Sequence, residues 1–498
     1  MAPMWRSFQK RPSRLVLAII LVYLIVGGLY AVYNPDWQAP DEPAHYNYIH
    51  HLAETHHFPI LKPGDYPAAY LEEIKAAHFP PEMSIAPIRF EFHQPPLYYL
   101  LAAPVYWLFG GALLPLRFLS LGMGVLLLMV VWWTVGELAP GRPFLAVGTT
   151  AFIAFLPMHL AMTAAVNNDI LAELLIATGF LLVVRYVRAE SRLAGEVEPG
   201  LLFLLGLVTG LGFLTKSSAY VALPLALAAI ATRHLWLDAP PPSAVYSLKA
   251  VGLFLLPAVA LGAPWWLRNL ALYGDTDFLG LGRHEQVVVG QLRTAEFVAE
   301  HGQLRLVYDF FQTSFRSFWG QFGWMGVLLD QRLYQALVIL SALAGVGWII
   351  WATERWRNRF RVPPWQWAAG GLLALSALFT LASYVWYNTT FVQHQGRYLF
   401  PALLPIGLAV TVGWREALRR ERAVLMACLL VFSAAALRVG GALSHWPLLL
   451  LAATAIALGF CRLLPPSFNP VVQASPYLLL IALDVVSLFL FIVPQLRV

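Results

Sequence analysis

Two adjacent carboxylates, Asp41 and Glu42, follow the first long apolar segment of the chain. Anchoring a chain in lipid needs no acid at that place, whereas a reaction at the lipid–water boundary can use one. Pro43 suits the first turn of a helix, where an acidic side chain also interacts favourably with the helix dipole. Asp41 is therefore either a plain helix cap or a chemically active group, and the local sequence leaves both readings open.

His45 lies one helical turn beyond Asp41, on the same face of the expected helix. These two side chains are the ones that could hold a divalent metal ion, although two ligands do not define a site. A divalent metal therefore stays open as a cofactor, and no other cofactor is expected.

Further polar residues that lipid anchoring does not explain stand near the ends of other apolar segments. They are His93 and Gln94, Asn168 and Asp169, Lys216, Arg268 and Tyr273, and Gln395, Arg397 and Tyr398. Ionisable groups at membrane depth cost about 2.5–3.5 kcal/mol each, so such residues are functional candidates by default. The topology places them on one side of the membrane, which predicts a single external cavity.

The composition indicates a membrane protein. Of the 498 residues, 59% are hydrophobic and only 12% are charged, whereas a soluble domain carries about 25% charged residues. Apolar runs of roughly twenty residues recur, and each can cross a bilayer core of about 30 Å. The net charge of +6 does not indicate nucleic-acid binding, because the basic residues fall in short loops. The two cysteines, Cys428 and Cys461, lie in apolar runs and predict no disulfide framework.

The hydropathy pattern predicts about thirteen membrane-spanning helices. We expect them near 15–33, 115–135, 143–162, 169–187, 200–215, 217–232, 248–267, 332–352, 366–386, 398–414, 422–440, 445–462 and 475–494. The first run is too long for a signal-peptide core and is taken as an uncleaved span. Basic loops on the side of the N-terminus predict that this side is cytoplasmic.

These spans divide the chain into a cytoplasmic N-terminus (1–14), a catalytic membrane region (15–410) and C-terminal helices (411–498). Two long segments, 34–114 and 268–331, face outward as the first and fourth external loops. Each is expected to contain a juxtamembrane helix, one opening at Pro95-Pro96 and one carrying Phe310, Phe311, Phe315, Phe318 and Trp319. The predicted fold class is therefore an all-α multi-pass membrane bundle.

A family resemblance connects the unusual residues. They occur as Pro40-Asp41-Glu42-Pro43-Ala44-His45, His93-Gln94-Pro95-Pro96-Leu97-Tyr98-Tyr99, Asn168-Asp169, Leu214-Thr215-Lys216-Ser217, Trp266-Leu267-Arg268-Asn269 with Tyr273-Gly274-Asp275, and Gln395-Gly396-Arg397-Tyr398. In the order, side and spacing of these motifs, the chain resembles the GT-C superfamily of membrane glycosyltransferases, which use polyprenyl-phosphate-linked sugars. The resemblance implies that an acid in the first external loop is the catalytic base. Asp41 matches that position, and its acidic neighbour Glu42 keeps the choice open. Related enzymes differ in their need for a divalent metal.

The chemistry of such a donor sets the demands on the site. Phosphate is a good leaving group, so an inverting transferase needs one carboxylate to deprotonate the acceptor hydroxyl. Cations must stabilise the charge that develops on the departing phosphate, and Arg397, Lys216 and Arg268 are the candidates. His93 would bind the acceptor or the phosphate, while Asn168 and Asp169 would brace the cavity or cap a span.

The expected function is transfer of a sugar from a polyprenyl-phosphate donor to a glycan, lipid or protein acceptor at the outer face of the plasma membrane. A flippase or transporter for a lipid-linked sugar is the competing function from another class, although transporters often contain internal repeats and this chain shows none. The sequence is also compatible with a polysaccharide ligase or a non-catalytic scaffold subunit.

Overall fold

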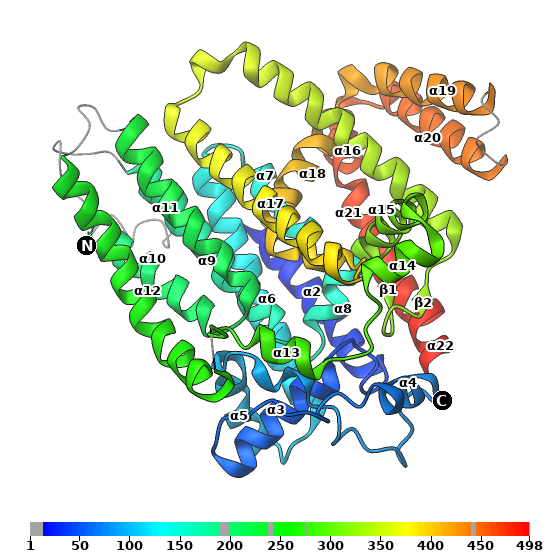
Figure 1. The fold of residues 1–498 in the computed structure, drawn as a ribbon. Helices are drawn as coiled ribbons and strands as arrows, with labels where there is room; N and C mark the ends of the chain where they lie inside the picture. The colour runs from blue at the N-terminus through cyan, green and yellow to red at the C-terminus, as the bar shows by residue number, and fades with distance from the viewer. Residues whose placement is uncertain (1–12, 190–198, 238–242, 275, 440–444, 498) are drawn as a thin grey trace.

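The computed structural model describes residues 13–189, 199–237, 243–274, 276–439 and 445–497. Most of the expected cytoplasmic N-terminus (residues 1–12) lies outside the described residues, as does Asp275 of the Tyr273-Gly274-Asp275 motif. Within the described residues the protein is a bundle of long helices with a layer of short helices at one end (Figure 1).

Ten helical stretches among the described residues are long and apolar enough to cross a membrane. Six of them are single helices, namely α2 (Arg14–Tyr33), α6 (Leu113–Leu138), α9 (Asp169–Arg188), α12 (Ala244–Tyr273), α16 (Gln331–Arg357) and α17 (Pro364–Thr390), and α20 (His445–Leu463) contributes a seventh. The other three are composite, namely η2 (Ser217–Val221) with α11 (Ala222–Thr232) and η3 (Arg233–Leu237), η5 (Gly396–Ala402) with α18 (Leu403–Ala417), and η7 (Pro466–Phe468) with α21 (Asn469–Val486), η8 (Ser487–Ile492) and α22 (Val493–Leu496).

The all-helical, multi-pass architecture is thus confirmed, and the part of the chain that the structure describes holds ten helical stretches that meet the length and hydropathy of a span, against the about thirteen expected. The expected span 143–162 is broken into α7 (Pro143–Ala154) and α8 (Pro157–Thr163), which meet at 67° and make an eleventh span only if counted together. Two others are short, α10 (Pro199–Phe213) with 15 residues and α19 (Ala423–Val439) with 17. An apolar run shows where a helix forms, but it does not show where that helix bends or ends.

Short helices form a layer at one end of the bundle, and both expected juxtamembrane helices are present. The first loop contains α3 (Glu42–Thr55), α4 (Ala68–Ala76), the 3-10 turn η1 (Phe90–His93) and α5 (Leu97–Leu108), and α3, α4 and α5 lie together at the lower end of the bundle in Figure 1. The loop after α12 contains α13 (Leu281–Val287), α14 (Thr294–His301) and α15 (Gln303–Trp319). A two-residue hairpin follows, in which β1 (Gln321–Phe322) pairs antiparallel with β2 (Val327–Leu328). The remaining turns are η4 (Arg359–Arg361) and η6 (Arg420–Arg422).

The most enclosed spanning helix is α9, in which 83% of the apolar window is buried. It packs against α6, α10, α11 and α17, and its first residue is Asp169. A predicted site residue therefore stands at the N-terminal end of the central helix, where packing on several sides fixes its position.

Two glycines set the distance between α16 and α18. A Cβ atom on Gly413 would lie 1.9 Å from the carbonyl oxygen of Ala344, and one on Gly347 would lie 2.0 Å from the carbonyl oxygen of Gly413. Small residues allow membrane helices to approach this closely and to gain van der Waals contact. The two helices can therefore keep their spacing only with glycine at both positions.

We expect Gly413→Ala to lower the stability of the bundle, because α16 must move away from the added methyl group. Overpacking of this kind costs about 1–3 kcal/mol. Gly345→Ala is the matched control. Gly345 lies on the facing helix α16 but has open space around it, and alanine favours the helix. Thermal unfolding of both variants in detergent measures the difference; equal transition temperatures would contradict the close approach.

Candidate functional site

Asp41 occupies the residue before α3 in a left-handed backbone conformation, with φ of 68°. Such a conformation is uncommon for a residue other than glycine and is often found where structure serves function. The Asp41 side chain makes no capping hydrogen bond to α3. Its Oδ2 instead accepts a hydrogen bond from Nη2 of Arg397, at 2.7 Å, so the plain helix-cap reading does not describe this residue.

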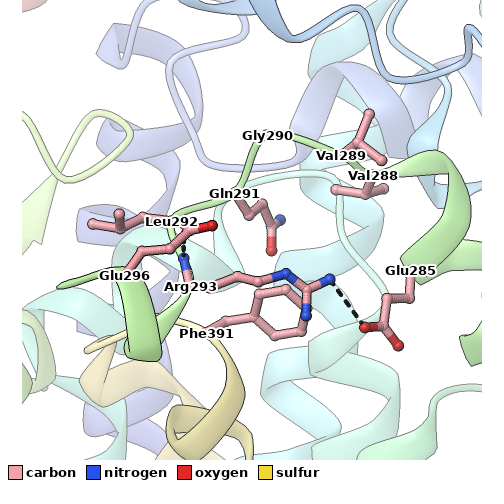
Figure 2. A pocket seen from close by; sticks show the side chains of 9 residues that line it. All are labelled: Glu285, Val288, Val289, Gly290, Gln291, Leu292, Arg293, Glu296 and Phe391. Atoms are coloured by element: carbon pink, nitrogen blue, oxygen red, sulfur yellow. Dashed lines mark hydrogen bonds and ion pairs between the residues drawn. The ribbon is translucent and has the colours of Figure 1, made fainter. Parts of the chain in front are cut away.

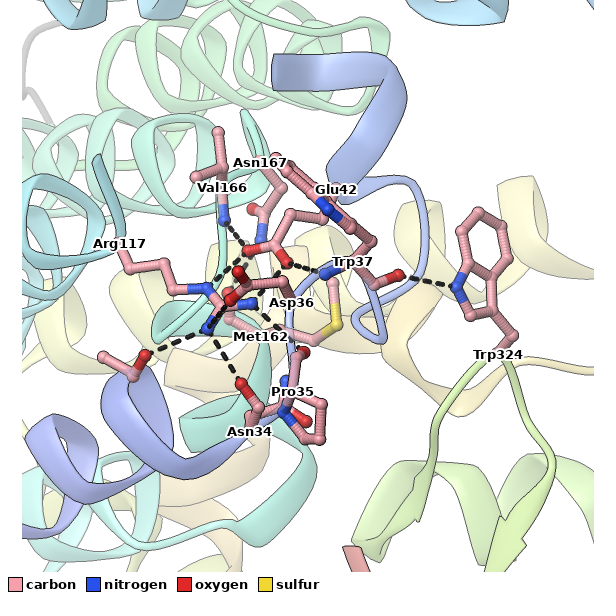
Figure 3. Close-up of polar contacts among 11 residues, drawn as sticks. Asn34, Pro35, Asp36, Trp37, Glu42, Arg117, Met162, Val166, Asn167 and Trp324 are labelled. Carbon is pink, nitrogen blue, oxygen red and sulfur yellow. Dashed lines mark hydrogen bonds and ion pairs between the residues drawn. The ribbon is translucent and has the colours of Figure 1, made fainter. Parts of the chain in front are cut away.

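Glu42 has a different environment from its neighbour. Its side chain is fully buried and forms two hydrogen bonds with Arg117, Nε to Oε1 at 2.9 Å and Nη2 to Oε2 at 2.6 Å (Figure 3). The backbone N–H groups of Val166 and Trp37 donate to the same two oxygens, at 3.1 and 3.2 Å. Arg117 also donates to the carbonyl oxygens of Ala31, Asn34 and Pro35. Both oxygens of Glu42 are thus occupied by contacts that join α2, α3 and α6.

A second acid–base pair lies beside the first. Nζ of Lys216 is 2.7 Å from Oδ1 of Asp169, and Lys216 and His45 interact electrostatically with Asp41. Burial raises the pKa of Asp41, but the charges of Arg397 and Lys216 outweigh it and lower that pKa below the usual value of a carboxyl group. Asp41 is therefore ionised at neutral pH.

Arg397 is held in place by the approach of η5 to α15. A Cβ atom on Gly396 would lie 2.3 Å from the carbonyl oxygen of Ser314, so only glycine fits there. The N–H of Gly396 donates to Oγ of Ser317 at 2.7 Å. Gln395 accepts from Nε of Arg397 at 2.7 Å, and the Tyr398 ring lies under the guanidinium with 5.6 Å to its centroid.

Neutral polar side chains complete the cluster. A ring nitrogen of His45 is 2.8 Å from the hydroxyl of Tyr99. Burial lowers the pKa of both His45 and His93, so both imidazoles are neutral at neutral pH. Asn168 donates to Oε1 of Gln94 at 3.3 Å and to the carbonyl oxygen of Thr215 at 3.1 Å. The Asn168 amide therefore links the segment between α2 and α6 to the residue before Lys216.

Arg268 and Tyr273 are not brought into this cluster. Arg268 donates to the carbonyl oxygen of Pro59 at 2.5 Å, and its guanidinium lies over the Trp265 ring at 4.3 Å from the centroid. The hydroxyl of Tyr273 accepts from the N–H of Leu61 at 3.2 Å. Both side chains tie α12 to the segment between α2 and α6, so of the three expected cations the structure brings Arg397 and Lys216 together with Asp41.

Among the described residues, no group of three or more His, Cys, Asp or Glu side chains could hold a metal ion. Asp41 faces Arg397, and His45 is bonded to Tyr99. The side chains at this site therefore do not fit a metal held by the protein alone.

Three buried polar atoms near the site lack a hydrogen-bond partner in the described part of the chain. They are Nε2 of Gln38, Oε2 of Glu91 and Oδ1 of Asn168. Buried polar groups are normally satisfied, and exceptions mark places that a ligand or water completes. The sequence singled out only Asn168 as a site residue. Glu91 stands two residues before His93, and Arg117 is an ionisable residue within the expected span 115–135, so both carried a signal.

A separate cavity of about 350 Å³ opens between residues 285–296 and Phe391 (Figure 2). Arg293 lies over the Phe391 ring, 5.3 Å from its centroid, and donates to Glu285 at 3.2 Å. None of the predicted site residues lines this cavity. Phe391 contacts Tyr387, which contacts Tyr398, so the cavity is joined to the charged cluster through aromatic rings.

The chain is similar to known proteins in part of its sequence and in its fold. Residues 93–260 match the family model described as dolichyl-phosphate-mannose-protein mannosyltransferase. No curated protein sequence matches the chain. The fold is similar to that of ArnT from Cupriavidus metallidurans, solved with bound undecaprenyl phosphate, with 14% identity, a TM-score of 0.51, and coverage of 97% of this chain and 76% of ArnT.

ArnT in its apo state gives the same values. The archaeal oligosaccharyltransferase AglB from Archaeoglobus fulgidus, solved with an inhibitory peptide and a dolichol-phosphate, gives a TM-score of 0.45 at 15% identity, and 93% of this chain aligns with 56% of AglB. The chain thus has a fold similar to that of ArnT, and its residues 93–260 resemble the dolichyl-phosphate-mannose-protein mannosyltransferase family in sequence.

Proposed function

We propose that the protein transfers a sugar from a polyprenyl-phosphate donor to an acceptor hydroxyl, with inversion at the anomeric carbon. The observation that carries the proposal is the carboxylate of Asp41, bonded to Arg397 beside the Lys216–Asp169 pair. The match of residues 93–260 to the mannosyltransferase family model supports the reaction class. The undecaprenyl phosphate bound to the similarly folded ArnT supports the donor class.

The reaction needs one proton transfer and one displacement. Asp41 takes the proton from the acceptor hydroxyl, and the oxygen attacks the anomeric carbon as the bond from that carbon to the phosphate oxygen breaks. The bonding electrons leave with the phosphate, and polyprenyl phosphate is released. A single displacement inverts the configuration, and the acceptor is a hydroxyl of a glycan, a lipid or a protein.

Arg397 and Lys216 hold the phosphate in this proposal. Arginine binds phosphate through two parallel hydrogen bonds, and a lysine adds a point charge. Each cation is paired with a carboxylate in the structure, at 2.7 Å, so the donor phosphate competes with Asp41 for Arg397. When the phosphate takes that guanidinium, Asp41 loses the charge that lowers its pKa and becomes a stronger base.

The orientation of the protein in the membrane follows from its basic loops. We place the site at the outer face of the plasma membrane and the N-terminus in the cytoplasm, as the basic loops of the sequence indicate. The juxtamembrane helices α3, α4 and α5 then cover the external end of the bundle, where Asp41 and Asp169 lie.

Asp41→Asn should lower the transfer rate at least about 100-fold, the usual contribution of a general base. Asparagine tolerates the left-handed conformation of this residue and can still accept from Arg397, so the transition temperature should stay that of the wild type. Transfer of radiolabelled sugar from undecaprenyl-phosphate-linked donors measures the rate. Full activity of this variant would refute Asp41 as the base, and movement of unchanged donor across vesicles without product would favour a flippase.

Glu42→Gln should instead act on stability, because it leaves the buried guanidinium of Arg117 without its carboxylate. Removing one partner of a buried pair costs about 3–5 kcal/mol. The free energy of unfolding in detergent should fall by about that amount. If Glu42→Gln kept wild-type stability but lost transfer, the base would be Glu42 and not Asp41.

Arg397→Ala and Lys216→Ala should each weaken binding of undecaprenyl phosphate by about tenfold or more, since each removes a charge-assisted contact. Arg268→Ala is the matched control, because its guanidinium binds a backbone carbonyl outside the cluster. Ligand titration in nanodiscs measures the dissociation constants. An Arg268→Ala loss as large as that of Arg397→Ala would place the phosphate elsewhere.

A further inference from the structure

Glu91 is a buried carboxylate whose side chain has no hydrogen-bond partner among the described residues. Its side chain belongs to η1 and is 9% exposed, and its Oε2 makes no hydrogen bond to any described residue. The nearest basic residue in sequence, Arg89, donates to the carbonyl oxygen of Ala86 at 2.6 Å. A buried polar group without a partner costs stability, so this carboxylate is expected to have a function outside the fold.

Packing places Glu91 beside the charged cluster. The turn η1 lies between α3, which begins beside Asp41, and α13. The ring of His93 in η1 contacts the ring of His284 in α13, with the ring planes tilted by 46° and the centroids 4.4 Å apart. Glu91 and Asp41 both act electrostatically on His45 and on His284, so both carboxylates lie near these two imidazoles.

The imidazoles around Glu91 do not neutralise it. Burial lowers the pKa of His45, His93 and His284, and the three rings are uncharged at neutral pH. Asp41 and Asp169 differ from Glu91 in this respect, because each has a cation at 2.7 Å. Among the described residues, Glu91 is therefore the one carboxylate of the site with a buried oxygen, Oε2, that receives no hydrogen bond.

The two halves of the site thus suit different parts of one ligand. The half that contains Arg397 and Lys216 suits a phosphate, whereas a phosphate next to Glu91 would meet like charge. A carboxylate flanked by neutral imidazoles suits a group rich in hydroxyls, since the carboxylate accepts two hydrogen bonds and each neutral imidazole offers one donor and one acceptor. A sugar ring has this chemistry.

We propose that Glu91 binds hydroxyl groups of the donor sugar, with His45 and His284 flanking them, and so fixes the sugar relative to the phosphate. This inference rests on the proposed function. Glu91 is a specificity residue in it and takes no part in proton transfer.

The test distinguishes binding of the sugar from binding of the phosphate. Wild type and Glu91→Gln are titrated in nanodiscs with undecaprenyl phosphate and with undecaprenyl-phosphate-linked glucose, galactose, mannose and arabinose. For the tightest sugar-linked ligand, Glu91→Gln should raise the dissociation constant about tenfold, because a bond to a charged acceptor is lost. Binding of bare undecaprenyl phosphate should change less than twofold. Glu54→Gln, an exposed change on α3, should alter neither.

Stability provides the second measurement. The transition temperature of Glu91→Gln should equal or exceed that of the wild type, because an unpaired buried charge is removed, whereas loss of a structural contact would lower it. Glu91→Asp, which keeps the charge but shortens the side chain, should also weaken only the sugar-linked ligand.

Several outcomes would overturn the assignment of Glu91. They are equal losses for bare and sugar-linked ligands, no loss for either, or a wild type that binds both equally. If the wild type neither bound undecaprenyl phosphate nor transferred sugar, the proposed function itself would fail, and that outcome is distinct from the others.

Discussion

The buried ion pair of Glu42 and Arg117 is the constraint on which the site depends. It joins the end of α2 to the start of α3 and to α6, and backbone N–H groups of Trp37 and Val166 complete it. Because Glu42 is fixed there, the preceding residue is held in its left-handed conformation and its side chain points elsewhere. Two adjacent acids thus have opposite roles, one in the fold and one facing a cation 356 positions away.

Much of this arrangement could be predicted from the sequence. Long apolar runs are a strong signal because lipid requires every backbone group to be satisfied within a helix. Their polar ends showed that Asp41, Lys216 and Arg397 belong to one side of the membrane. The same pattern placed Arg268 with them, but the guanidinium of that residue binds the carbonyl oxygen of Pro59 and lies over the Trp265 ring. Hydropathy indicates how deep in the membrane a residue lies, but not in which direction its side chain points.

The other features that the sequence did not predict have related physical causes. Helix length and bending are decided by tertiary packing, so α10, α19 and the 67° break between α7 and α8 did not follow from composition. Which of Asp41 and Glu42 is buried depends on Arg117, a partner 75 positions away from Glu42. His284 lies in an ordinary polar loop of the sequence, and only the fold brings its ring against His93.

The pairing of charges also explains how such a site can exist without ligand. Two cations and two carboxylates at 2.7 Å neutralise each other, which offsets much of the cost of keeping them out of water. In the proposed reaction, an incoming phosphate replaces the carboxylate of Asp41 at Arg397, and the negative charge of Asp41 then stays unpaired until it takes the proton of the acceptor. The same exchange raises the basicity of Asp41 only when a donor is present. Binding of the donor and activation of the base are then one event, because a single guanidinium cannot fully neutralise both the phosphate and Asp41.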